Sequence, residues 1–156
     1  MPPPYDDELA LRRLAETYAR YADRCDGRRL AELFVPGGQL RIRRPGELTP
    51  STTLHGHAEI AAAIDRLTRY DATFHLVANH IAACDGDDAT AEVYCLAHHV
   101  TGRGDGHDEP RDHVMVIRYI DRCRRGADGW RFVERELQVD WTEERVVTAA
   151  PAARRA

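Results

Sequence analysis

Apolar residues near the start of the chain recur at the spacing of an α-helix. Those positions are Leu11, Leu14, Tyr18, Tyr21, Ala22 and Cys25. A period near 3.6 residues, preceded by Asp6 or Asp7 as a cap, predicts one long amphipathic helix. A short second helix is expected after Gly27, running to Phe34, with Asp26 as its cap and the Pro-Gly-Gly segment 36–38 ending it.

The next segments predict a strand, a loop and a third helix. Gln39–Arg43 is expected as a short strand, and a loop rich in Pro, Gly, Ser and Thr follows over Pro45–Thr53. Within His57–Tyr70, apolar residues return to helical spacing, which predicts the third helix.

From residue 73 onward the apolar residues alternate with a period of two. Four runs show this pattern: Thr73–Cys84, Ala89–Thr101, His113–Cys123 and Trp130–Val139. Turn-rich segments join them, so we predict an antiparallel meander. Helices first and strands afterwards indicate an α+β fold in which three N-terminal helices pack on a curved, mainly antiparallel sheet that encloses a pocket. We expect a single domain over residues 6–141, with flexible termini at 1–5 and 148–156.

The composition excludes several classes of chemistry. All 22 Lys+Arg residues are arginine, so a Schiff-base lysine and the lysine of a P-loop are impossible. With 26 Asp+Glu residues the net charge is -4, which argues against a nucleic-acid partner. No run approaches the ~20 apolar residues of a membrane helix, and the start resembles no targeting signal, so we expect a cytoplasmic protein with no membrane partner.

The metal-binding residue types lack the spacing of a metal site. The four cysteines, Cys25, Cys84, Cys95 and Cys123, are far apart in the sequence and are expected as free, mostly buried thiols. The eight histidines form no known ligand motif. We therefore expect neither a metal nor a cofactor.

Asp23 is the first candidate for chemistry. It lies near the end of the first predicted helix, beside the apolar stripe. Helix geometry alone leaves two alternatives, because most aspartates are exposed: a surface carboxylate, free or paired with Arg20 or Arg24, or a functional group.

His75 is the second candidate. Alternation places it with Thr73, Val77 and Asn79 on one face of a strand whose two faces are both rich in apolar residues, so we expect that strand to be buried on both sides. A buried polar group without a partner costs about 1–3 kcal/mol, so His75 and Asn79 need hydrogen-bond partners or a polar cavity. A histidine satisfied within the core is the alternative.

His98 and His99 are adjacent, so they point to opposite faces of their strand. Small residues share the face of His99, namely Ala91, Val93, Cys95 and Ala97. Small neighbours leave space for a ligand, which favours His99 as the inward residue. If the match of this strand to the pocket were shifted by one residue, His98 would be the inward residue instead.

Several local patterns occur in the order found in a known family. They are the segment 18–26 running into Leu30–Phe34, the segments 54–60 and 73–80, and Arg118–Asp121 with Asp128–Phe132 in the last two strands. Together they resemble the SnoaL-like domains of the NTF2-like superfamily, in the branch with scytalone dehydratase and hexachlorocyclohexane dehydrochlorinase. The resemblance covers roughly residues 6–141 and implies a cone-shaped α+β fold.

The resemblance also implies an activity. Asp23 and His75 match a catalytic dyad of those enzymes, and gapless counting back from Leu33-Phe34 selects Asp23 over Asp26. An aspartate that accepts from one ring nitrogen makes the other nitrogen a base near neutral pH. The implied function is a cofactor-independent lyase or isomerase, of dehydratase or cyclase type, acting on an apolar or aromatic small molecule with oxygen substituents.

The other expected pocket residues are Tyr18, Asn79, His99, Tyr119 and Asp121. Tyr119 and Asp121 share a strand face that lines either the pocket mouth or a subunit contact in a homodimer or homotrimer. The alternative function is a non-catalytic ligand-binding or assembly module, like the small subunit of Rieske-type oxygenases. A pocket with His75 facing Asp23 would favour catalysis, and a filled core would favour assembly.

Overall fold

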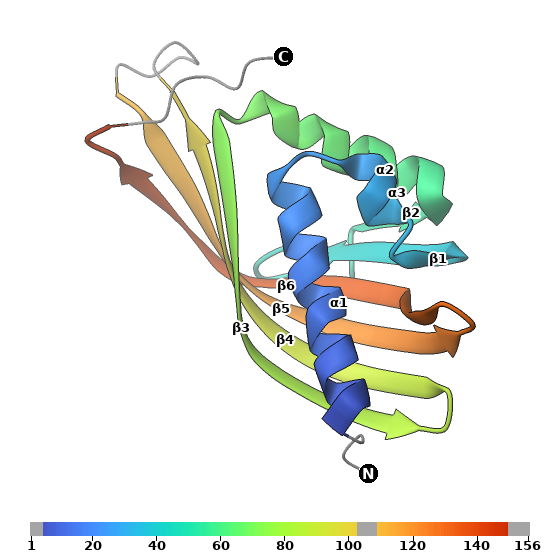
Figure 1. Cartoon of the computed structure of the whole chain (residues 1–156). Helices are drawn as coiled ribbons and strands as arrows, with labels where there is room; N and C mark the ends of the chain where they lie inside the picture. The colour runs from blue at the N-terminus through green and yellow to red at the C-terminus, as the bar shows by residue number, and fades with distance from the viewer. Residues whose placement is uncertain (1–4, 103–108, 150–156) are drawn as a thin grey trace.

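Helices occupy the first part of the chain and long strands the rest, which confirms the α+β class (Figure 1). The computed structural model describes residues 5–102 and 109–149, so most of the two expected flexible termini lies outside the described residues. The elements are α1 (Tyr5–Asp23), α2 (Gly27–Ala31), β1 (Phe34–Arg43), β2 (Thr52–His55), α3 (Gly56–Asp65), the 3-10 helix η1 (Arg66–Arg69), β3 (Ala72–Asp85), β4 (Asp88–Thr101), β5 (Arg111–Gly126) and β6 (Gly129–Val146).

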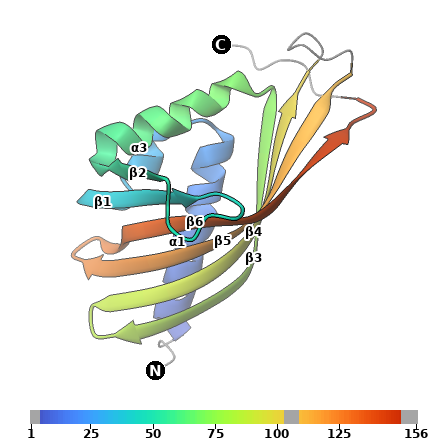
Figure 2. The same cartoon turned by 180° about the vertical axis from the view of Figure 1, so that it is seen from behind.

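Six strands form one sheet in the order β2-β1-β6-β5-β4-β3. β1 runs parallel to β6, and every other neighbouring pair is antiparallel. Figures 1 and 2 show a strongly bent sheet with the helices on its concave side, where α1 crosses the strands and α3 lies towards one end. The predicted curved, mainly antiparallel sheet is therefore confirmed.

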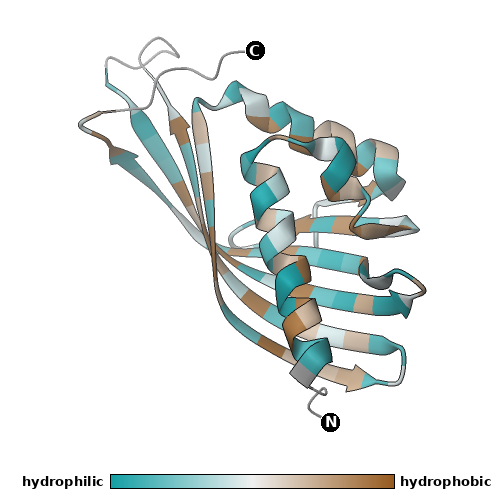
Figure 3. Ribbon diagram, viewed as in Figure 1, coloured by the Kyte–Doolittle hydropathy of each residue, from teal (hydrophilic) through white to brown (hydrophobic). Residues whose placement is uncertain are grey.

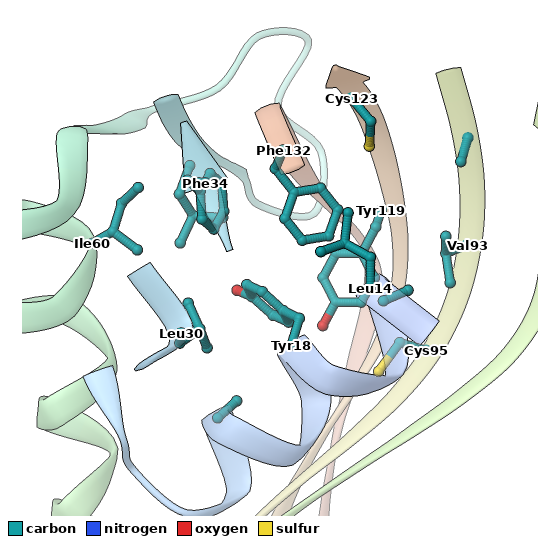
Figure 4. Packing of buried hydrophobic residues seen from close by; sticks show 14 of the residues in the cluster. Leu14, Tyr18, Leu30, Phe34, Ile60, Val93, Cys95, Tyr119, Cys123 and Phe132 are labelled. Atoms are coloured by element: carbon teal, nitrogen blue, oxygen red, sulfur yellow. The ribbon is translucent and has the colours of Figure 1, made fainter. Parts of the chain in front are cut away.

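The core lies between α1 and the concave face of the sheet. Figure 3 shows hydrophobic and hydrophilic residues alternating in patches along the strands, as expected when only one face of a sheet is covered. Tyr18 of α1 is 3% exposed and packs edge-on against Phe132 and Tyr119, with ring centroids 6.1 and 5.7 Å apart (Figure 4). These aromatic contacts hold α1 in a fixed position over β5 and β6.

Several boundaries differ from the prediction. The third helix, expected over His57–Tyr70, ends at Asp65 and continues as the 3-10 helix η1. Phe34, expected at the end of the second helix, begins β1, because its ring packs 5.1 Å from that of Phe132 in the core. The expected loop over Pro45–Thr53 contains the start of β2, which pairs with β1. β6 continues to Val146, past the strand end and the domain end that the sequence predicts. The changes at Phe34, β2 and β6 each depend on a pairing or packing partner in another element.

The outer face of β3 is exposed, so the prediction that this strand is buried on both sides is wrong. Phe74 is 58% exposed and Leu76 is 48% exposed. β3 is an edge strand of the sheet, and the helices cover only the opposite, concave face (Figure 1). β3 therefore has apolar residues on both faces although only its concave face is covered by helices.

Candidate active site

The end of α1 positions Asp23. Cys25 adopts a left-handed conformation (φ 51°), its amide donates to the carbonyl oxygen of Ala22 at 3.0 Å, and the amide of Asp26 donates to that of Tyr21 at 3.0 Å. This pair of bonds is the Schellman motif, which ends a helix. Cys25 therefore lies outside the helix, and Asp23 is the last helical residue, facing β3.

Asp23 and His75 form a hydrogen-bonded pair. His75 Nδ1 donates to Asp23 Oδ1 at 2.7 Å, and the backbone amide of His75 donates to Asp23 Oδ2 at 3.1 Å. The side chain of His75 is 7% exposed. Because both carboxylate oxygens engage one residue, the ring is held in one orientation with its proton on Nδ1, and Nε2 is left to accept a proton. Asp26 instead caps α2, as expected, by accepting from the amide of Arg29 at 3.1 Å.

His75 lines a cavity of about 560 Å³ between the helices and the sheet. Its apolar wall is formed by side chains from β1, β2, α3, η1, β5 and β6: Leu40, Ile42, Leu54, Ile64, Leu67, Met115, Ile117, Leu137 and Val139. Asp23 is not part of the wall, so it contacts the cavity only through His75. The arrangement places a base on the surface of an apolar cavity of a size typical for small-molecule sites.

The charged side chains of this cavity are all cationic. Arg44, Arg66 and Arg69 line it and are exposed, so they form its rim. Within residues 5–102 and 109–149, no Asp or Glu contributes to the lining. The cavity is thus locally positive, although the whole chain carries a net charge of -4.

His99 faces this cavity, and His98 faces the opposite side of the sheet. The ring centroid of His99 lies 5.5 Å from that of His75 and 4.8 Å from that of Tyr70. His98 Nδ1 donates to Asp112 Oδ2 at 2.7 Å, away from the cavity. The structure therefore places His99, and not His98, beside His75.

His99 is a neutral imidazole at neutral pH. Its side chain is almost completely buried, and this burial, followed by the neighbouring His75, lowers the pKa of His99 to about 4. Its Nδ1 atom is buried and has no hydrogen-bond partner among the described residues. An unpartnered ring nitrogen in a cavity wall is able to hydrogen-bond to an oxygen of a bound molecule.

Replacing His99 by Gln is expected to reduce the loss of stability on acidification. The pKa of His99 is about 4 in the folded protein and 6.5 in a solvated histidine, so the unfolded chain binds its proton first as pH falls. The wild type therefore loses about 3 kcal/mol of unfolding free energy through this group between pH 6.5 and 4. Urea unfolding of both proteins at pH 7 and 4.5 measures the difference, and equal losses would contradict it.

Both predicted pocket tyrosines, Tyr18 and Tyr119, line the cavity, but the predicted Asp121 does not. Burial raises the pKa of Tyr18 to about 12 and that of Tyr119 well above its usual value, so both hydroxyls stay protonated. Asp121 is paired instead with Arg135, whose Nε and Nη2 donate to it at 2.8 and 2.6 Å. Tyr119 and Asp121 are both buried beneath α1, so the expectation of a subunit contact there is also wrong.

A β-bulge removes Asn79 from the pocket. Val77 pairs with Cys95 and His80 with Val93, so β3 contains an extra residue in this stretch. A bulge reverses the side to which the following residues point. Asn79 is exposed and does not line the cavity with His75, so that prediction is wrong.

His113 lines the cavity although it is not among the predicted pocket residues. It lies opposite His99 on β5 and is hydrogen-bonded through Nδ1 to Glu144 of β6. His113 and Tyr119 are an even number of positions apart on one strand, so their side chains are expected on the same face, and this signal could have placed His113 on the inner face. Its pairing with Glu144 carries no local signal, because Glu144 lies in the part of β6 beyond the predicted strand end.

None of the four cysteines forms a disulfide within the described residues, and two of them, Cys95 and Cys123, are buried, fewer than expected. Burial raises the pKa of Cys95 to about 11, so its thiol is protonated and unreactive.

In the described part of the chain, no three His, Cys, Asp or Glu side chains are grouped to hold a metal ion. No helix of this part is long and apolar enough to cross a membrane.

The chain belongs to the SnoaL-like domain family, whose model matches residues 4–136. An NTF2-like protein with a cystatin-like fold from Novosphingobium aromaticivorans is similar at 27% identity, with 95% of this chain and 86% of that chain covered and a TM-score of 0.62. These findings confirm the NTF2-like fold that the resemblance implies.

Two further solved structures carry enzyme names. A protein assigned as a scytalone dehydratase from Novosphingobium aromaticivorans is 21% identical, with 95% and 94% of the two chains covered and a TM-score of 0.73. A hexachlorocyclohexane dehydrochlorinase of type 2 is 15% identical, with 92% and 93% covered and a TM-score of 0.74. At these identities the likeness shows the fold alone. No curated protein matches the chain.

Proposed function

We propose that this protein is a cofactor-independent lyase or isomerase of small molecules, with His75 as general base and Asp23 as the residue that positions it. The observation that carries the proposal is the position of His75 between the Asp23 carboxylate and an apolar cavity of about 560 Å³. The names of two structural neighbours, a dehydratase and a dehydrochlorinase, support an elimination.

The reaction begins with proton removal from carbon. Nε2 of His75 takes a proton from a carbon beside a carbonyl or phenol, and the C–H electrons form a double bond. In an elimination a leaving group departs with its bonding electrons, and in an isomerisation the proton returns to another carbon. His99 is neutral, and its Nδ1 has no hydrogen-bond partner in the described part of the chain, so it donates or accepts a hydrogen bond at the substrate oxygen. Asp23 stabilises the imidazolium that forms on His75.

The cavity lining favours a particular class of substrate. Its apolar wall suits an aliphatic or aromatic body, and the Tyr18 and Tyr119 hydroxyls and the ring of His99 suit oxygen substituents. The rim arginines favour an oxygen atom that carries full or partial negative charge. We therefore propose an apolar or aromatic small molecule with oxygen substituents, as the resemblance implies.

An assembly role is the second candidate function. One observation, an exposed apolar row on the outer face of the sheet, favours a subunit contact, and such a contact is compatible with catalysis. Leu76, Leu96 and Trp141 are exposed and are brought into one row across β3, β4, β5 and β6 on the outer face of the sheet. Exposed apolar residues in a contiguous row are typical of a subunit contact. The expected homodimer or homotrimer stays a prediction, and the open cavity favours an enzyme over a purely structural subunit.

Replacing Asp23 by Asn tests the dyad. The probe is 5-nitrobenzisoxazole, which loses its carbon-bound proton to a base while the N–O bond breaks to give a coloured nitrile phenolate. An Asn amide that donates to Nδ1 places the ring proton on Nε2, where it blocks the base. We expect kcat/KM for the probe to fall about 10²-fold.

Asp26→Asn is the matched control for this experiment. It makes the same substitution three positions away, and Asn is an equally good helix cap, so the rate is expected to stay unchanged. Wild-type turnover no faster than that of free imidazole would overturn the proposed function. An Asp23→Asn rate equal to the wild type would remove Asp23 from the mechanism.

A further inference from the structure

We propose that His113, positioned by Glu144, is the general acid of this site and delivers a proton to the leaving group. This inference rests on the proposed function, because it assigns the second half of the same elimination. It concerns a residue that lies two strands away from His75 in the sheet.

His113 and His75 have the same arrangement. Each ring lines the cavity, and each is hydrogen-bonded through Nδ1 to a carboxylate: His75 to Asp23, and His113 to Glu144. Neither carboxylate is part of the cavity lining. In both pairs the carboxylate engages Nδ1, so Nε2 is the nitrogen that can exchange a proton with a bound molecule.

The three cavity histidines form a row on adjacent strands. The ring centroid of His99 lies 5.5 Å from that of His75 and 6.3 Å from that of His113. Each outer ring is hydrogen-bonded to a carboxylate, whereas Nδ1 of the central ring has no hydrogen-bond partner among the described residues. A molecule lying along this row meets a carboxylate-paired imidazole at each end and the neutral His99 ring in the middle. That is the arrangement an elimination needs, with a base at one carbon and an acid at the leaving group.

The proton balance of the step is complete. His75 Nε2 takes the proton from carbon, the C–H electrons form the new π bond, and the bond to the leaving oxygen breaks with its electron pair. The His113 imidazolium then donates its Nε2 proton to that oxygen. After one turnover His75 is protonated and His113 is neutral. Both rings line the cavity, so after the product leaves, water takes the proton from His75 and returns one to His113, whose side chain is 34% exposed.

The alternative to catalysis is that the pair of His113 and Glu144 has a purely structural role. His113 and Glu144 lie directly opposite each other on β5 and β6, and Glu144 is 55% exposed, so the contact also suits an ordinary cross-strand pair. His98 provides the comparison, because it also pairs with a carboxylate, Asp112, but faces away from the cavity. A histidine–carboxylate pair therefore occurs on this sheet without access to the cavity, and only an assay that senses the leaving group separates the two roles.

Two probes that differ only in their leaving group test the proposal. 5-Nitrobenzisoxazole releases a nitrophenolate that leaves readily without a proton, whereas unsubstituted benzisoxazole releases a more basic phenolate that benefits from an acid. We expect His113→Gln to slow the unsubstituted probe about tenfold and the nitro probe less than about twofold. The expected factor is modest because even the unsubstituted phenolate is a fair leaving group.

Further variants keep the result interpretable. Glu144→Gln changes only an exposed side chain and is expected to reproduce the same selectivity with a smaller factor, and His98→Gln is expected to leave both rates unchanged. Equal slowing of both probes by His113→Gln, or no slowing of either, would overturn the assignment while leaving His75 in place. Loss of both rates with His75→Ala, together with a leaving-group effect confined to the His113 and Glu144 variants, would establish it. Wild-type turnover that does not depend on His75 would instead overturn the proposed function.

Discussion

Replacing His75 by Ala is expected to slow elimination of 5-nitrobenzisoxazole by about 10²–10⁴-fold, the range that a positioned general base contributes. The variant keeps the cavity and the rim arginines but removes the ring between Asp23 and the cavity. Added imidazole is expected to restore part of the rate, because the deletion leaves a space of the same shape. Initial rates with and without imidazole measure both effects.

His98→Ala is the matched control for the His75 variant. It removes a histidine that also pairs with a carboxylate, but on the outer face of the neighbouring strand, so the rate is expected to remain that of the wild type. Thermal unfolding of both variants shows whether either one loses the fold. A folded His75→Ala protein that retains the wild-type rate would show that another group removes the proton.

Replacing Asp121 by Asn is expected to lower the free energy of unfolding by about 3–5 kcal/mol, because it leaves a buried guanidinium without its counter-ion. Arg135 is 0% exposed and Asp121 2%, and two hydrogen bonds join them. The guanidinium carbon lies 4.4 Å from the ring centroid of Tyr18, 4.2 Å from that of Tyr119 and 4.1 Å from that of Phe132. Aromatic faces stabilise a cation but do not replace a carboxylate. Urea unfolding measures the loss.

The double variant Asp121→Leu with Arg135→Met separates the charge from the packing. Replacing both members of a buried ion pair by apolar residues of similar volume is often neutral, so most of the stability is expected to return. If Asp121→Asn costs less than about 1 kcal/mol, the pair is better solvated than its exposure indicates. The result also bears on the site, because Tyr18 and Tyr119 line the cavity and rest on this pair.

Hydrophobic periodicity was sufficient for the class of fold and for part of the site. The helical spacing through Tyr18 and Ala22 predicts α1, and the small residues that share a strand face with His99 favour that face as the inner one. Alternation did not identify the inner face of β3, because both of its faces are rich in apolar residues. These signals are local, since each depends on the geometry of one element and on which of its sides is apolar. The match to a family pattern added the pairing of Asp23 with His75, which no single element encodes.

The remaining features of the site arise only when distant strands pair. The bulge that turns Asn79 outward is set by the register of β3 against β4, and it leaves no alternation signal that a single strand reveals. The contact between His113 and Glu144 and the buried pair of Asp121 and Arg135 depend on the register of β5 against β6. The sequence by itself determined the α+β class, the order of the helices and of the four long strands, and the inward face of β4. Tertiary structure decided which polar residues meet across those faces, because strand register and helix cover are properties of the whole sheet.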